Sequence, residues 1–178
     1  MTDRTRACAL SLVLLVVCSA LSTHAVGQGG GDTRARMLGA WHLESRTVRK
    51  AGGEILRDPV LGAEPPGRLF YDGSGNISLQ MMRADRAQAI SVPSNPQDAK
   101  NPRVILGYDS YFGTFRLNPS AGTVIHHVEG SLFPEDLGKD FERRLTVDAD
   151  RLTLGFTSKS PDGDVIRTLV FRRSGSSR

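Results

Sequence analysis

Cysteine is almost absent from this sequence. Among its 178 residues only Cys8 and Cys18 are cysteines, and both lie in an apolar N-terminal stretch that we expect to be removed. The remaining chain, about 178 − 25 = 153 residues, would then hold no disulfide, no thiolate nucleophile and no cysteine metal ligand. A chain of that length can bury a real hydrophobic core, and we expect one domain that depends on that core.

Histidine is also scarce. Of the four histidines, His42, His126 and His127 lie outside the N-terminal stretch. Adjacent residues on a strand point to opposite faces, so His126 and His127 cannot converge on one ion, whereas a zinc site needs three or four ligands. The chain also contains no phosphate-binding loop followed by a helix and no nucleophile elbow. We therefore predict that the protein uses no metal and no cofactor.

A strongly basic surface is missing too. The 23 lysines and arginines are nearly balanced by 19 acidic residues, for a formal charge of +4. Basic pairs such as Arg143-Arg144 and Arg172-Arg173 occur, but no basic stripe alternates with aromatic residues. Nucleic acid is therefore not an expected partner.

The N-terminus has the pattern of a secretory signal. A short basic segment (1–6) precedes an apolar segment (7–21), and Thr23-His24-Ala25 offers a cleavage site after small residues. We predict a signal peptide over residues 1–25 and export to the periplasm or the medium. An uncleaved anchor is the alternative, although the apolar segment is shorter than the roughly 20 residues of a membrane span. We expect no membrane span after processing, and the oligomeric state is left open.

The rest of the chain is dominated by short segments with a period of two. We predict a flexible linker over 26–37, with one helical turn near its end, a β-domain over 38–173 and a frayed tail over 174–178. Strands are expected at 39–49, 54–57, 67–71, 76–83, 108–117, 123–133, 140–147, 151–157 and 165–172. A polar, proline-containing loop (84–103) interrupts them. Consecutive hairpins of this kind favour an all-β, antiparallel up-and-down barrel of about eight strands.

Alternation also assigns side chains to faces. In the first strand, Trp41, Leu43, Ser45 and Thr47 share one face, so Arg46 is expected on the other. In later strands the residues expected to share one face are Ile77, Leu79 and Met81; Tyr111, Gly113, Phe115 and Leu117; Phe141, Arg143, Leu145 and Val147; and Leu152, Leu154 and Phe156.

Several segments resemble a known family. Gly39-Ala40-Trp41 resembles the Gly-x-Trp element of lipocalins, where the tryptophan closes the barrel floor against an arginine from the last strand, here Arg172 or Arg173. The order of six segments, of which the first contains this element, looks like the bacterial and fungal lipocalin-like domain family: 38–41, 67–71, 80–86, 107–113, 126–134 and 152–154. The resemblance implies a calycin-type barrel. It implies no single activity, so function must come from the site.

The segment 123–134 contains the candidate chemistry. If His127 faces inward with Glu129, the carboxylate could orient the imidazole for proton transfer near neutral pH. If His126 faces inward instead, between Val124 and Val128, it could serve as a polar anchor in an apolar pocket. Alternation cannot decide between them, and we expect His127 to face the interior.

Other residues are predicted to contact a ligand. They are Tyr108, Tyr111, Phe115, Arg143, Met81 and Gln80, together with His126. Arg143 lies on an apolar face and needs a partner there, either Glu129 or a ligand carboxylate. We predict an exported barrel that binds a small, mostly apolar or amphipathic molecule. The alternative is an isomerase, cyclase or dehydratase that uses His127 and Glu129, and a third is an interaction module with an exposed apolar patch.

Overall fold

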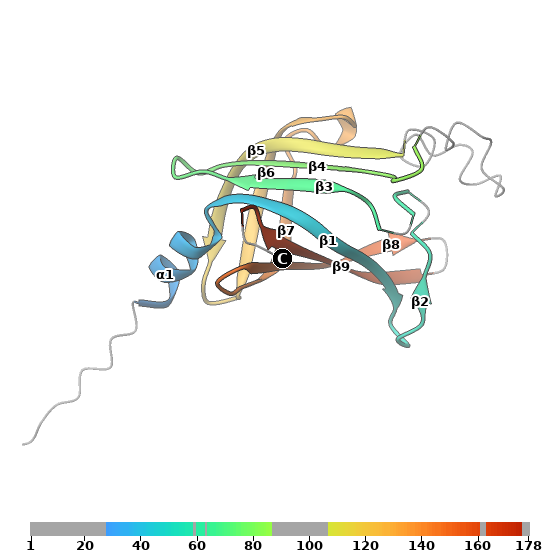
Figure 1. Cartoon of the computed structure of the whole chain (residues 1–178), viewed down its shortest axis with the longest axis horizontal. Coiled ribbons are helices and arrows are strands. Elements are labelled where there is room, and N and C mark those ends of the chain that lie inside the picture. The colour runs from blue at the N-terminus through green and yellow to red at the C-terminus, as the bar shows by residue number, and fades with distance from the viewer. Residues whose placement is uncertain (1–27, 59, 63, 87–106, 161–162, 176–178) are drawn as a thin grey trace, which may run out of the picture.

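The described residues form nine β-strands in the computed structural model (Figure 1). These residues are 28–58, 60–62, 64–86, 107–160 and 163–175. The expected signal peptide (1–25), most of the expected loop 84–103 and the end of the tail lie outside them. The elements are α1 (Gln28–Met37), β1 (Gly39–Lys50), β2 (Ile55–Leu56), β3 (Gly67–Tyr71), β4 (Asn76–Met82), β5 (Tyr108–Asn118), β6 (Thr123–Ser131), the 3₁₀ helix η2 (Pro134–Asp136), β7 (Asp140–Val147), β8 (Arg151–Ser160) and β9 (Gly163–Arg173).

Eight of these strands form a closed antiparallel barrel. From β3 onward each strand pairs with the next one in sequence, β1 pairs with β3, and the pairing of β1 with β9 closes the ring. The short β2 pairs only with Val48 and Arg49 at the far end of β1. Closure leaves the barrel strands without a free edge. The prediction of an all-β up-and-down barrel is confirmed.

Tight turns explain why neighbouring strands pair. Between β3 and β4, the Asp72 carboxylate accepts a hydrogen bond from the Asn76 backbone N–H at 2.8 Å. Gly75 in the same turn has a φ of 96°, a conformation that side chains with a Cβ rarely adopt. The turn reverses the chain within a few residues, so the apolar positions of β3 and β4 face the same interior.

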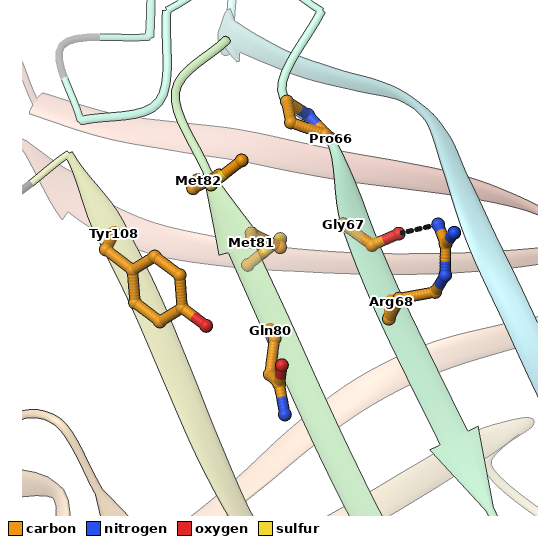
Figure 2. Close-up of a pocket in the computed structure, with 7 residues that line it drawn as sticks. All are labelled: Pro66, Gly67, Arg68, Gln80, Met81, Met82 and Tyr108. Carbon is orange, nitrogen blue, oxygen red and sulfur yellow. Dashed lines mark hydrogen bonds between the residues drawn. The ribbon is translucent and has the colours of Figure 1, made fainter. Parts of the chain in front are cut away.

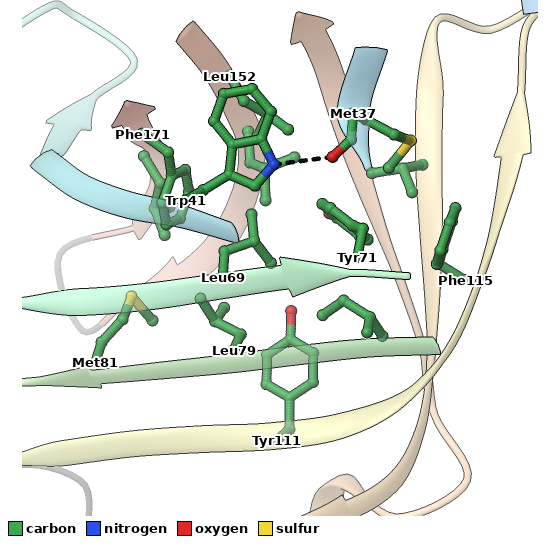
Figure 3. Packing of buried hydrophobic residues seen from close by; sticks show 14 of the residues in the cluster. Met37, Trp41, Leu69, Tyr71, Leu79, Met81, Tyr111, Phe115, Leu152 and Phe171 are labelled. Atoms are coloured by element: carbon green, nitrogen blue, oxygen red, sulfur yellow. Dashed lines mark hydrogen bonds between the residues drawn. The ribbon is translucent and has the colours of Figure 1, made fainter. Parts of the chain in front are cut away.

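The alternating apolar positions build the core as expected (Figure 3). Side chains from the inner faces of the barrel strands pack together with three residues from α1 and the loop after β2. The cluster contains Met37, Trp41, Val60, Leu61, Leu69, Tyr71, Ile77, Leu79, Met81, Tyr111, Phe115, Val124, Val128, Val147, Leu152, Leu154, Leu169 and Phe171.

Strand β1 departs from the predicted alternation. Its register with β9 shifts between Leu43 and Ser45, so Glu44 is the extra residue of a bulge. A bulge moves every following side chain to the opposite face. Arg46 therefore points inward, with only 6% of its side chain exposed. The expectation that Ser45 and Thr47 share the inner face with Trp41 is wrong.

One end of the barrel is closed by Trp41. The segment predicted as a linker forms α1 instead, and its last carbonyl, at Met37, accepts a hydrogen bond from the indole Nε1 at 2.8 Å. The Arg173 guanidinium lies 4.2 Å from the centre of the indole ring. Arg172 is on the opposite face and pairs with Glu44 at 2.6 Å. Of the two arginines considered from the sequence, the floor arginine is thus Arg173, and an assignment of this structural role to Arg172 is wrong. In the part of the chain that the structure describes, no helix is long and apolar enough to span a bilayer.

Candidate functional site

A histidine held by two tyrosines lies inside the barrel. His126 is on the inner face of β6 and is fully buried. Its Nε2 lies 2.7 Å from the Tyr71 hydroxyl of β3, and its Nδ1 lies 2.8 Å from the Tyr111 hydroxyl of β5. Three strands thus bring one polar side chain each to the same point inside the barrel. We call these residues the tyrosine–histidine trio (Tyr71, Tyr111 and His126).

Burial keeps all three members of the trio neutral. It lowers the pKa of His126 to about 3, with a further contribution from the positive charge of Arg143. It also raises the pKa of Tyr71 and that of Tyr111 well above the ordinary value of a phenol. Around neutral pH the trio therefore acts through hydrogen bonds rather than through charge.

The trio has one more hydrogen-bond donor than its two internal hydrogen bonds use. A neutral imidazole has one N–H and one acceptor nitrogen. One tyrosine must therefore donate to His126, while the other accepts from it and keeps its own hydroxyl proton. Two hydrogen bonds use two of the three available protons. The third proton can be given to another acceptor.

Arg143 occupies the same interior from β7. Its guanidinium lies 3.8 Å from the centre of the Phe156 ring and 4.9 Å from that of Phe141. Burial lowers the pKa of Arg143, while Tyr111 and Tyr71 act in the opposite direction. An arginine keeps its charge even so. The prediction that Arg143 faces the interior is confirmed, and a pair with Glu129 is not formed.

A second polar cluster lies inside the barrel, near the end that is remote from α1. Nη1 of Arg46 is 2.7 Å from Oδ2 of Asp58, although the pair lacks the angles of a directed hydrogen bond. The other carboxylate oxygen of Asp58 accepts the N–H groups of Val60 and Leu61 at 2.9 and 3.0 Å. Arg167 of β9 lies near this pair, on the same inner face.

His127 and Glu129 lie outside the barrel. The side chain of His127 is 49% exposed, and its Nδ1 is 2.9 Å from Oδ1 of Asp140 on the neighbouring strand β7. Glu129 is exposed on the same outer face. The expectation that His127 faces the interior is wrong, because the partners inside the barrel, Tyr71 and Tyr111, bind His126, whereas the partner of His127 lies on the outer surface. A catalytic role for His127 and Glu129 stays a prediction.

Of the other predicted ligand contacts, three side chains besides Arg143 point inward: Tyr111, Phe115 and Met81. Gln80 and Tyr108 belong to the outer side of β4 and β5, where they line a surface pocket of about 260 Å³ (Figure 2). That pocket lies over the start of β3 and the end of β4. Gln80 and Tyr108 are thus not brought together with the trio.

The sequence interpretation missed four residues of the interior. Tyr71 alternates with Leu69 in β3, so its inward direction could have been found from the pattern. The bulge in β1 reverses the faces of the residues that follow it, so alternation did not predict that Arg46 points inward. Asp58 lies in an irregular loop, and Arg167 in a strand whose faces were not assigned, so no local signal connected them. Within the described ranges, no group of three histidine, cysteine or acidic side chains is placed to hold a metal ion.

A closed eight-stranded meander with a tryptophan floor and a partly polar interior defines a calycin-type barrel, a class of fold that can enclose one small molecule. Residues 38–173 match the lipocalin-like domain family, and the chain belongs to this family. The comparison with curated proteins found no match. The family establishes the fold, and the residues of the site must supply the argument about function.

Proposed function

We propose that this protein is an exported barrel that binds a small, mostly apolar molecule, with the tyrosine–histidine trio as its polar anchor. The observation that supports this most is the unused hydroxyl proton of the trio, buried among apolar side chains. A few convergent polar groups in an apolar interior are the usual composition of a small-molecule site. The export signal predicted over residues 1–25 completes the proposal.

The neutrality of the trio indicates what it can recognise. A buried donor without an acceptor costs about 1–3 kcal/mol, so an acceptor that reaches it contributes binding energy. A carbonyl, ether or hydroxyl oxygen on the ligand would satisfy this donor. The apolar neighbours Leu79, Phe115 and Val128 would contact the rest of the molecule.

An enzyme that transfers protons is supported less well. An imidazole whose pKa is about 3 is a weak base at neutral pH. The other histidine of the segment, His127, is exposed and paired with Asp140 on the outer surface. The neutral trio could still polarise a carbonyl by hydrogen bonding, but we observe no nucleophile or second acid–base group beside it among the described residues.

Native mass spectrometry of the full chain, produced with its own N-terminus and purified without denaturation, tests the proposal. We expect a retained small molecule on the wild-type protein. Replacing both trio tyrosines, Tyr71→Phe with Tyr111→Phe, should reduce or abolish retention. Tyr108→Phe is the matched control, because this third tyrosine lies on the outer side, and its retention should equal that of the wild type.

Two outcomes would overturn the proposal. One is a wild-type protein that carries no small molecule and also fails to bind apolar fluorescent probes. The other is equal retention in the double variant and in Tyr108→Phe, which would show that the trio takes no part. Circular dichroism of each variant verifies that the barrel is folded, so a loss of retention is not mistaken for unfolding.

A further inference from the structure

Three polar groups on adjacent strands face the interior without hydrogen-bond partners. They are the Arg46 guanidinium on β1 (Nε and Nη1), Nε of Arg167 on β9 and Oγ of Ser158 on β8, and all of these atoms are buried. Oδ2 of Asp58, 2.7 Å from Nη1 of Arg46, likewise makes no directed hydrogen bond. β8, β9 and β1 are consecutive neighbours in the barrel. Buried polar groups are normally hydrogen-bonded, so three side chains with unpartnered polar atoms on neighbouring strands need an explanation.

Arg46 is deeply buried. Its side chain is 6% exposed, and its only charged partner among the described residues is Asp58. Asp58 itself is fixed, because one of its oxygens holds the loop N–H groups of Val60 and Leu61. The carboxylate therefore positions one edge of the Arg46 guanidinium, and the Nε of Arg46 is left for another acceptor.

Arg167 adds a second guanidinium without adding a carboxylate. It is opposite Val48 in the β1–β9 register, while Arg46 is opposite Leu169, so the two arginines are diagonal neighbours on one face. No carboxylate of the described residues lies within ion-pair distance of Arg167. Asp58 and Asp109 attract it from farther away, whereas Arg46 and Arg143 repel it. Of these two neighbouring cations, only Arg46 has a carboxylate of the described residues within ion-pair distance.

We propose that the molecule bound in the barrel carries a carboxylate, and that Arg167 and Arg46 receive it at the end remote from α1. This inference rests on the proposed function and specifies the chemical class of its ligand. A carboxylate has two acceptor oxygens and can bridge two guanidinium groups or bind one of them bidentately. Its negative charge compensates the excess cation, and the Ser158 hydroxyl lies on the adjoining strand to donate a further hydrogen bond.

The ligand class follows from the order of groups along the barrel. Arg143 stacks on Phe156, which is opposite Arg167 in the β8–β9 register, and its positive charge also acts on His126 of the trio. Beyond the trio the interior is apolar up to Trp41. A molecule with a terminal carboxylate and an apolar body matches this arrangement, with its charge at the arginine pair and its body along the interior.

Fluorescence titration with a matched pair of probes tests the inference. The probes are cis-parinaric acid and its methyl ester, which differ in charge and hardly in shape. We expect the wild-type protein to bind the acid at least tenfold more tightly, because hydrogen bonds to charged groups are the stronger ones. Arg167→Met should lower the affinity for the acid and thereby remove most of this preference.

Two further variants make the test specific. Arg167→Lys keeps the charge but loses the planar fork, so an intermediate preference for the acid is expected. Arg172→Met removes a neighbouring arginine on the outer face of β9 and should keep the full preference. Thermal melts followed by circular dichroism identify any variant that is unfolded. The comparison of acid with ester on the wild-type protein tests the inference without any substitution.

The outcomes separate the inference from the proposed function. Equal affinity of the wild type for acid and ester overturns the inference and leaves small-molecule binding in place. An unchanged preference in Arg167→Met overturns the assignment of the carboxylate to this cluster. If neither probe binds, the proposed function fails and the inference fails with it.

Discussion

The hydroxyl of Tyr71 lies 2.7 Å from Nε2 of His126, although 55 residues separate the two in the chain. This contact joins β3 to β6 across the interior of the barrel, and the Tyr111 hydroxyl on the other ring nitrogen joins β5 to the same point. A buried imidazole is tolerated only when its nitrogens have partners. The two tyrosines therefore explain why His126, and not its neighbour, lies inside.

Removing one of these hydroxyls should destabilise the protein. Tyr71→Phe keeps the ring and its edge contact with Phe115, but it leaves Nε2 of His126 buried without a partner. We expect the free energy of unfolding to fall by about 1–3 kcal/mol, measured by urea denaturation. The control Tyr108→Phe should change it by less than about 0.5 kcal/mol. Equal effects of the two variants would contradict the structure.

The buried histidine should make stability depend on pH. The pKa of His126 is about 3 in the folded protein, compared with the ordinary value of 6.5 that applies to the unfolded chain. Between these two pH values the unfolded state therefore binds a proton that the folded state does not. Stability is therefore complete above pH 6.5 and declines as the pH falls toward 3. The contribution of this one group approaches about 1.4 kcal/mol per pH unit.

Urea denaturation between pH 7.5 and 4.5 measures this slope. His126→Gln should flatten it, because the titrating group is gone. His127→Gln is the matched control, since the adjacent imidazole is exposed beside Asp140 and its removal should leave the slope in place. A slope that is unchanged in His126→Gln, or an NMR titration in which the His126 imidazole itself titrates near pH 6.5, would show that His126 is not buried as described.

The floor of the barrel should depend on Arg173 rather than Arg172. Arg173 stacks on Trp41 and donates to the backbone carbonyls of Leu38, Arg36 and Ala149. We expect Arg173→Met to lower the free energy of unfolding by about 2–3 kcal/mol and to shift the emission of Trp41, the only tryptophan in the chain, to longer wavelength.

Arg172→Met is the control for this prediction. Arg172 lies one residue away, in a partly exposed pair with Glu44, and such pairs contribute little to stability. The emission of Trp41 should not move in this variant. If Arg172→Met proves as damaging as Arg173→Met, the assignment of the floor arginine is wrong.

A glycine in β5 should be irreplaceable because of its neighbour in β6. A Cβ added at Gly113 would lie 2.0 Å from the backbone oxygen of His127, beside the irregularity in the β5–β6 register. Gly113→Ala should therefore cost at least about 1–3 kcal/mol and displace the strand that carries His126. Gly155→Ala, where the nearest atom would be 3.9 Å away, should be tolerated. Thermal melts of the two variants give the comparison.

Strand positions followed from the sequence because they depend on local pattern. The spacing of Ile77, Leu79 and Met81 assigns an inner face to β4 within one short segment, and the Asp72 turn reverses the chain by contacts among near neighbours. The same reasoning failed in β1, where a single extra residue, Glu44, inverted the faces and placed Arg46 inside. A bulge depends on the partner strand, so alternation within one strand does not reveal it.

The site was harder to predict than the fold. Both histidines have apolar neighbours in β6: Val124 and Val128 accompany His126, and Ile125, itself buried, accompanies His127. The local pattern therefore did not decide which side of β6 faces the interior of the barrel. The choice of His127 relied on Glu129 as a companion, whereas the partners that decide burial, Tyr71 and Tyr111, come from other strands.

The sequence by itself determined the number and order of the strands, the tight turns between them and the closure by a tryptophan near Gly39, because these depend on residues close together in the chain. Only the tertiary structure decided which histidine is buried, which arginine covers Trp41 and which arginine pairs with Asp58. Each of these outcomes depends on pairing polar groups that are distant in sequence. Burial makes such pairing obligatory, and it is the packing of the barrel that determines which partners meet.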